Sequence, residues 1–154
     1  MAIHSEISAR EAADRLAIRE LIDAYAFCAD SRDAQGQMAL FTEDTLFEVF
    51  MDAKDPTPTQ VVRGRDDLFP VFDNLNTYPV TMHFNGQARV ELDGDSATGL
   101  TYCRAHHIIG EGEGRQIMIA TIRYLDRMVR QDGAWLFAHR KLMVDWTETR
   151  PCHP

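Results

Sequence analysis

SAREAADRLAIRELIDAYAFCADSRD, residues 8–33, is the stretch around which we expect the chain to fold. Ser8 precedes Glu11 by three residues, which is the spacing of a capping box at a helix start. Apolar residues then recur with helical periodicity and commit one face to a core: Ile18, Leu21, Ile22, Tyr25, Cys28 and Ala29. We therefore expect the phenol of Tyr25 and the carboxylate of Asp30 at the edge of a space between this helix and a sheet.

The middle of the chain favours short elements. Ser31 or Asp33 is expected to cap a second helix, because both side chains accept hydrogen bonds from free backbone N–H groups. The expected features that follow are buried Met38, Leu40 and Phe41, a strand over 45–51, a loop containing two prolines, a short strand at 61–62, and a third helix from a cap at Asp66 or Asp67 to Leu75.

The C-terminal half reads as a meander. Three turn signals, at 93–95, 110–114 and 131–133, separate segments rich in β-forming residues. These segments predict long antiparallel strands over 81–92, 96–109, 116–130 and 134–146. Helices followed by such a sheet predict an α+β fold, with one domain over 1–154 and the helices on one face of the sheet. Long twisted strands around a helix favour a pocket where the sheet curves away.

The composition argues against several classes of function. Sixteen basic and twenty-four acidic residues give a net charge of −8 without a basic run, so nucleic acid is not an expected partner. Three cysteines lack the spacing of a zinc site or a disulfide framework. No segment has the apolar length of a membrane span or a signal peptide. We expect a cytoplasmic protein without a membrane partner.

The side chains suited to acid–base chemistry are Tyr25, Asp30, His83 and the pair His106 and His107. Histidine can take and return a proton near neutral pH, and a carboxylate on its far ring nitrogen fixes the tautomer. Tyr25 can donate to an oxygen that gains negative charge. Adjacent strand residues point to opposite faces, so at most one of the two paired histidines faces a pocket.

Simpler structural roles compete with each of these assignments. His83 suits a surface or satisfied strand residue, Asp30 a helix-end cap, and Tyr25 a core residue with its hydroxyl at the rim. Alternation places His83 on the polar face of its strand, so an inward His83 requires either a polar cavity or a bulge near Gly86. No nucleotide, hydrolase or zinc-protease motif is present, and we expect neither a cofactor nor a metal.

Three segments together resemble the SnoaL-like branch of the nuclear transport factor 2-like superfamily. They are DRLAIRELIDAYAFCADSRDAQGQMALFTEDTLFE, TMHFNGQARVELDGDSATGLTYCRAHH and RMVRQDGAWLFAHRKL, and the likeness covers roughly residues 10 to 146. The resemblance implies an α+β cone, in which a curved antiparallel sheet and N-terminal helices enclose a deep pocket. It also implies likeness to scytalone dehydratase, bile acid 7α-dehydratase and hexachlorocyclohexane dehydrochlorinase, which are cofactor-independent lyases that assemble as trimers.

The resemblance also suggests roles for individual residues. His83 matches the strand histidine of these lyases, Tyr25 and Asp30 match the tyrosine and aspartate of the bile acid dehydratase, and His107 is similar in position to the second histidine of scytalone dehydratase. Two positions depart from scytalone dehydratase, because Phe50 stands where it has a tyrosine and Tyr124 where it has an asparagine. The substrate-binding residues expected from this reading are Phe47, Phe50, Arg104, Tyr124 and Trp146.

The function expected from these residues is a dehydratase-type lyase acting on a small cyclic or aromatic, largely apolar substrate. An isomerase or a polyketide-type cyclase would use the same base and oxygen donor, and a binding module would use only the pocket. A homo-oligomer is expected in each case, either a trimer or a dimer, with the outer face of the sheet as its interface.

Overall fold

The computed structural model describes residues 6–152. The first helix and the C-terminal meander lie where the sequence predicts them. The elements are α1 (Ala9–Ser31), α2 (Ala34–Ala39), β1 (Phe41–Phe50), β2 (Gln60–Arg63), the 3-10 turn η1 (Asp66–Leu68), α3 (Phe69–Asp73), the 3-10 turn η2 (Asn74–Thr77), β3 (Thr81–Asp93), β4 (Ser96–Ile109), the 3-10 turn η3 (Gly112–Gly114), β5 (Gln116–Gln131) and β6 (Ala134–Pro151). Among these residues, no helix is both long and apolar enough to cross a membrane.

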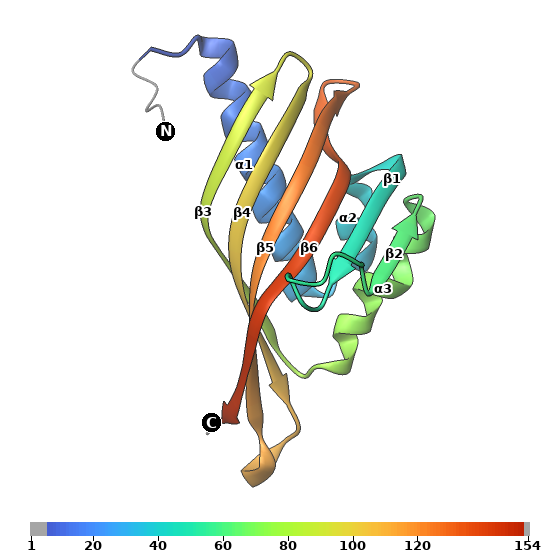
Figure 1. Cartoon of the computed structure of the whole chain (residues 1–154), viewed down its shortest axis with the longest axis vertical. Helices are drawn as coiled ribbons and strands as arrows, with labels where there is room; N and C mark the ends of the chain where they lie inside the picture. Colours follow the sequence, from blue (N-terminus) through green and yellow to red (C-terminus); the bar gives the residue numbers. More distant parts are fainter. Residues whose placement is uncertain (1–5, 153–154) are drawn as a thin grey trace.

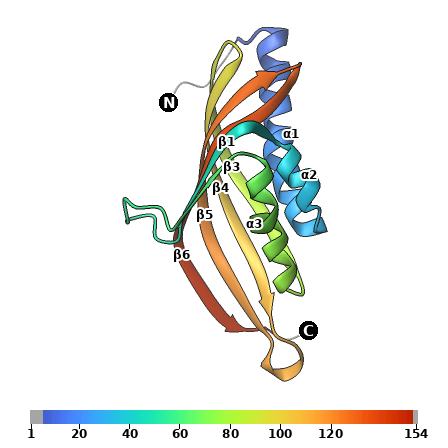
Figure 2. The same cartoon turned by 90° about the vertical axis from the view of Figure 1, so that its right-hand side faces the viewer.

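The strands form one curved sheet in the order β2-β1-β6-β5-β4-β3. The helices lie together on one of its faces, toward which the sheet curves (Figures 1 and 2). This arrangement confirms the predicted α+β fold. The expectation of a wholly antiparallel sheet was wrong at one pair, because β1 runs parallel to β6. After the β1–β2 hairpin the chain crosses to the far edge of the sheet, so the last strand of the meander returns alongside β1 in the same direction.

Three local predictions need correction. The first strand begins at Phe41, and not at Thr45, so the buried Phe41 belongs to the strand and not to α2. The third helix is broken into η1, α3 and η2, and no side chain caps its start; Pro70 lies in the first turn of α3. The last strand continues past 146 to Pro151 because it pairs with the start of β5.

Hydrogen bonds of its side chains connect helix α1 to the sheet near both of its ends. Ser8 accepts a hydrogen bond from the Glu11 backbone N–H, as the capping signal predicts. Near this end, the buried Asp14 bonds Arg130 of β5 and the indole N–H of Trp135 of β6. At the other end, Asp30 bonds residues of β3. Between these contacts the apolar stripe of the helix packs into the core.

A β-bulge in β3 decides which face of the strand turns inward. The pairing of β3 with β4 slips between Asn85 and Ala88, where Gly86 and Gln87 stand opposite the single residue Tyr102. Before the bulge, Met82 and Phe84 are exposed and the His83 side chain is 8% exposed. After it, the alternation is reversed, and Val90 and Leu92 pack against the core. The bulge explains how a histidine among outward-facing neighbours reaches the interior.

The core contains a buried ion pair among aromatic rings. The Arg140 side chain of β6 is fully buried, and its guanidinium donates from Nε and Nη2 to the Asp126 carboxylate of β5 at 2.7 and 2.8 Å. Its Cζ lies 4.2 Å from the ring centroid of Tyr25, 4.3 Å from that of Tyr124 and 3.8 Å from that of Phe137. Cation–π contacts and the carboxylate together offset the loss of water around the charge.

Candidate active site

A cavity of about 250 Å³ lies between the helices and the concave face of the sheet. Most of its wall is apolar, with contributions from α1, α3, β1, β5 and β6. The side chains in its wall that can exchange a proton or donate a hydrogen bond include Tyr25, His83, His107 and Tyr124. Phe47, which is expected from the sequence to bind substrate, also lines it. The structure therefore brings together most of the residues named from the sequence.

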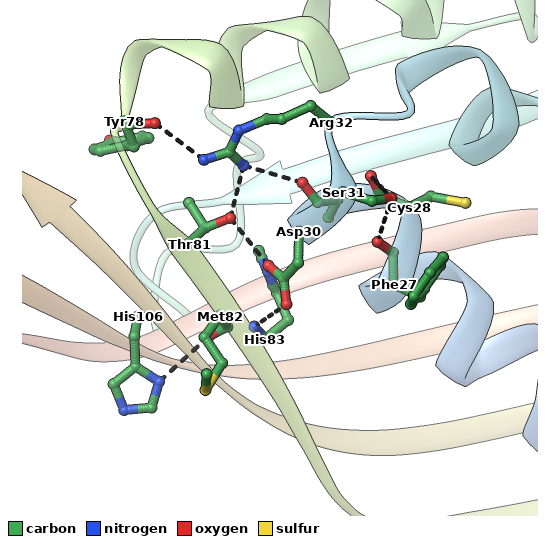
Figure 3. A network of polar contacts seen from close by, with 11 residues as sticks. Phe27, Cys28, Asp30, Ser31, Arg32, Tyr78, Thr81, Met82, His83 and His106 are labelled. Carbon is green, nitrogen blue, oxygen red and sulfur yellow. Dashed lines mark hydrogen bonds and ion pairs between the residues drawn. The ribbon is translucent and has the colours of Figure 1, made fainter.

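Asp30 and His83 form a close pair at this cavity (Figure 3). The Nδ1 atom of His83 lies 2.7 Å from Oδ1 of Asp30, and the His83 backbone N–H donates to Oδ2 of the same carboxylate at 2.7 Å. Because an ionised carboxylate only accepts hydrogen bonds, Nδ1 of a neutral His83 carries the proton. The other ring nitrogen, Nε2, then keeps its lone pair. His83 lines the cavity, so this arrangement offers a base to whatever the cavity holds.

Two further residues hold the Asp30 carboxylate in place. Thr81 donates from its hydroxyl to Asp30 at 2.9 Å and accepts from the Arg32 guanidinium at 2.7 Å. Arg32 also donates to the carbonyl of Tyr78, which fixes the chain just before β3. Burial raises the pKa of Asp30, but its hydrogen bonds to the side chain and backbone of His83 outweigh that effect and lower the pKa overall. Asp30 is therefore ionised at neutral pH.

Sequence reasoning missed Arg32 and Thr81. Arg32 follows α1 as its C-cap, in the left-handed conformation at φ 64°, which a residue other than glycine rarely adopts. This conformation ends the helix and turns the Arg32 side chain toward β3 (Figure 3). Its partners Tyr78 and Thr81 lie 46 and 49 residues further along the chain, and no local sequence pattern predicts a contact over that separation.

His107 is the member of the histidine pair that faces the cavity. It is buried, its ring lies 4.8 Å from that of Tyr78 and 5.8 Å from that of His83, and its Nδ1 has no hydrogen-bond partner among the described residues. His106 points away, toward the Met82 carbonyl (Figure 3). Burial, with a contribution from nearby His83, lowers the pKa of His107 to about 4. His107 is thus a neutral hydrogen-bonding group at pH 7.

His107 should make the protein sensitive to acid. Its pKa is 6.5 when unfolded and about 4 when folded, so between these values the unfolded chain binds more protons. The stability that comes from a neutral His107 is full above pH 6.5 and is lost as the pH falls to about 4, an expected loss of about 3 kcal/mol. When urea unfolding is measured between pH 7 and pH 4, the free energy of unfolding of the His107→Gln variant should change less with pH than that of the parent protein. The His106→Gln control should retain the dependence of the parent; equal slopes for parent and His107→Gln would contradict the assignment.

Tyr25 lies at the inner end of the cavity within the aromatic core. Its ring makes edge-to-face contacts with Phe41, Phe72 and Tyr124. Burial raises the pKa of Tyr25 to about 12, against the opposing effect of the Arg140 charge. The hydroxyl therefore keeps its proton at neutral pH, and Arg140 polarises it as a hydrogen-bond donor. Arg140 was not among the residues singled out from the sequence, since a basic residue on a strand gives no sign of burial.

Three residues expected to bind substrate do not line the cavity. Arg104 is exposed, because it alternates with the inward-facing Cys103 and Ala105 on β4. Phe50 is buried, but it lies on the opposite face of β1 from Phe47. Trp146 is 61% exposed. A slip in the pairing of β5 with β6 places the extra residue just before Trp146, which turns its side chain outward. Among the described residues, no group of three or more His, Cys, Asp or Glu side chains is arranged to hold a metal ion.

The fold and the cavity define a class, the nuclear transport factor 2-like α+β domains. Within this class, a family model for SnoaL-like domains matches residues 10–141, and the chain belongs to that family. The uncharacterized protein Rv2910c of Mycobacterium tuberculosis is 26% identical over 141 residues, which are 88% of each chain.

Two solved structures show how closely the fold is shared. Hexachlorocyclohexane dehydrochlorinase LinA type 2 superposes with a TM-score of 0.78 at 18% identity, over 94% of this chain and 95% of that one. A candidate scytalone dehydratase from Novosphingobium aromaticivorans gives a TM-score of 0.75 at 24% identity, over 94% and 91% of the two chains. At these identities the likeness establishes the fold alone.

Proposed function

We propose that this protein is a cofactor-independent lyase of the dehydratase type, acting on a small cyclic or aromatic, largely apolar substrate. One observation carries the proposal. A histidine is bonded to a carboxylate at 2.7 Å, the carboxylate is held by further donors, and the histidine forms part of the wall of a mostly apolar cavity. Burying such a pair costs solvation free energy, and an apolar pair would fill the same space without that cost. The presence of the pair beside a cavity therefore favours a functional role.

In the proposed reaction, His83 Nε2 takes a proton from a carbon atom of the substrate. The electron pair of the broken C–H bond forms the new double bond as the neighbouring C–O bond breaks. The Asp30 carboxylate stabilises the imidazolium that forms, which then returns the proton to the departing hydroxide, so that water leaves. Tyr25, with neutral His107 nearby, donates to an oxygen that gains charge.

The family and the structural relatives support this chemistry. By name, one of the two superposed proteins is a dehydrochlorinase and the other a candidate dehydratase, and both names describe elimination. The apolar wall of the cavity suits an apolar ring. We also propose a homo-oligomer, because Met82, Phe84 and Trp146 are exposed apolar side chains on strands of the sheet. The preference for a trimer over a dimer comes from the resemblance to the trimeric lyases.

Substrate screening tests the proposed reaction. A panel of cyclic and aromatic β-hydroxy carbonyl compounds would be incubated with the protein and followed by mass spectrometry. Loss of water from at least one compound supports the lyase. Conversion to a product of unchanged mass would favour an isomerase, for which the neutral His107 ring near His83 is a specific argument, since it can help to relocate a proton. Binding without any conversion across the panel would favour a binding module.

Asp30→Asn should slow turnover by up to about 10⁴-fold without abolishing it, the size of loss observed when the carboxylate that orients a catalytic histidine is replaced by an amide. The amide would still accept a hydrogen bond but could not stabilise the imidazolium. The kcat of the variant on the first active compound is the measurement, with Asp23→Asn on the exposed part of α1 as the control. Unchanged kcat in Asp30→Asn would show that the pair has no catalytic role.

A further inference from the structure

The exposed lining residues show where the cavity opens. Met51, Gln60, Asn74 and Thr147 are exposed, while every other lining residue is buried or half-buried. These four belong to the β1–β2 loop, the start of β2, the start of η2 and the last part of β6. The mouth therefore lies on the β2 side of the sheet. His83 comes from β3, at the opposite edge.

A groove continues outward from this mouth. It has a volume of about 740 Å³ and lies between β2 and α3. Gln60, Val71 and Asn74 line both the groove and the cavity, so the two spaces meet at these residues. A second hollow of about 700 Å³ lies between the start of α1 and β3, but it shares no lining residue with the cavity.

The size of the cavity limits what it can hold. Its volume of about 250 Å³ falls below the range of about 300 to 1,000 Å³ that is usual for small-molecule sites. A ring fits beside His83, but a larger substrate must extend through the mouth. The groove between β2 and α3 is the continuous space available to that extension.

Two charged side chains line the groove, in addition to the polar Gln60 and Asn74. Arg63 of β2 and Asp67 of η1 line it and both are exposed. Neither of these two side chains makes a hydrogen bond or ion pair with another residue in the described part of the chain. The neighbouring Arg65, by contrast, pairs with Glu43 at 3.4 Å. The groove thus presents a free donor and a free acceptor of opposite charge, a combination that suits an uncharged group with both functions.

We propose that the substrate carries a tail ending in an amide-like group, which lies in the groove while its apolar ring occupies the cavity. The carbonyl oxygen of the tail accepts from Arg63 and its N–H donates to Asp67. This inference rests on the proposed function, since it assumes that the reacting ring lies at His83. In this proposal Arg63 and Asp67 determine which substrate binds, and the residues of the cavity carry out the reaction.

Ligand binding tests the proposal without knowledge of the substrate. The probes are naphthol and a series of naphthyl ethers that end in a carboxamide on linkers of increasing length. Calorimetry should show that the best ether binds the parent protein about tenfold more tightly than naphthol, as two added hydrogen bonds predict. Arg63→Ala and Asp67→Ala should each remove most of this gain and leave naphthol binding unchanged. Glu91→Ala, in the separate hollow between α1 and β3, is the matched control and should retain the gain.

The outcomes separate this inference from the proposed function. The histidine NMR signals of His83 and His107 report whether the naphthyl ring enters the cavity. If naphthol shifts them but no ether binds more tightly, or if the gain survives in both alanine variants, the groove proposal is wrong while the cavity site stands. If naphthol neither binds nor shifts these signals, the proposed small-molecule site fails and the groove proposal fails with it.

Discussion

Replacing His83 with alanine is expected to lower kcat by about 10²- to 10⁴-fold, the usual contribution of a positioned general base. Asp30 keeps two of its hydrogen-bond partners in this variant, since Thr81 and the backbone N–H of residue 83 still donate to it. The fold should therefore survive, and circular dichroism and the unfolding midpoint should remain close to those of the parent. The kcat on the first active compound is the deciding measurement.

His106→Ala is the matched control for this experiment. His106 lies on the neighbouring strand, paired with Met82, but its ring points away from the cavity. The control should retain the full kcat. Retention of activity in His83→Ala, or an equal loss in both variants, would contradict the role assigned to His83.

Replacing Asp126 with asparagine is expected to lower the free energy of unfolding by about 3 to 5 kcal/mol. The change leaves the Arg140 charge fully buried without its carboxylate, and the surrounding rings of Tyr25, Tyr124 and Phe137 cannot replace water around it. Urea unfolding measures the loss. Because Arg140 packs on Tyr25, the Tyr25 ring should also be held less firmly in the cavity wall in this variant.

Asp145→Asn provides the comparison on the same sheet. Asp145 pairs with Arg123, but both side chains are partly exposed, so the expected loss is about 0 to 1 kcal/mol. A double variant, Asp126→Leu with Arg140→Met, removes both buried charges and should be more stable than Asp126→Asn alone. Equal losses in the Asp126 and Asp145 single variants would show that burial of the Arg140 pair does not carry the expected cost.

Local signals in the sequence predicted most of the fold. The cap at Ser8 and the apolar stripe of α1 follow from short-range chemistry, and the glycine-containing turns divide the meander correctly. A bulge near Gly86 was one of the two arrangements that the sequence allowed for an inward His83, the other being a polar cavity, and the structure contains the bulge. The parallel pairing of β1 with β6 was not foreseen, since it joins segments about 90 residues apart.

The errors in the site have physical causes. Phe47 and Phe50 are three positions apart on one strand, so period-two geometry excludes their sharing a face, and the same rule separates Arg104 from His107. Trp146 lies two residues after Val144, which lines the cavity, and would share its face if the pairing were regular. The irregular pairing at that point could not be read from composition. Arg32 and Thr81 were missed because their contacts are formed only by the tertiary fold.

Solvent deuterium exchange tests most directly whether His83 takes a proton from carbon. Cyclic ketones that bind the cavity would be incubated in D₂O with the parent protein, His83→Gln and His106→Gln, and deuterium incorporation would be followed by NMR. Exchange requires only that the ketone has a removable proton on carbon, and it requires no leaving group. The measurement therefore tests proton removal separately from the elimination of water. Protein-dependent exchange is expected with the parent and with His106→Gln, and only background exchange with His83→Gln. Exchange at the parental rate in His83→Gln would contradict the role of His83 as the base.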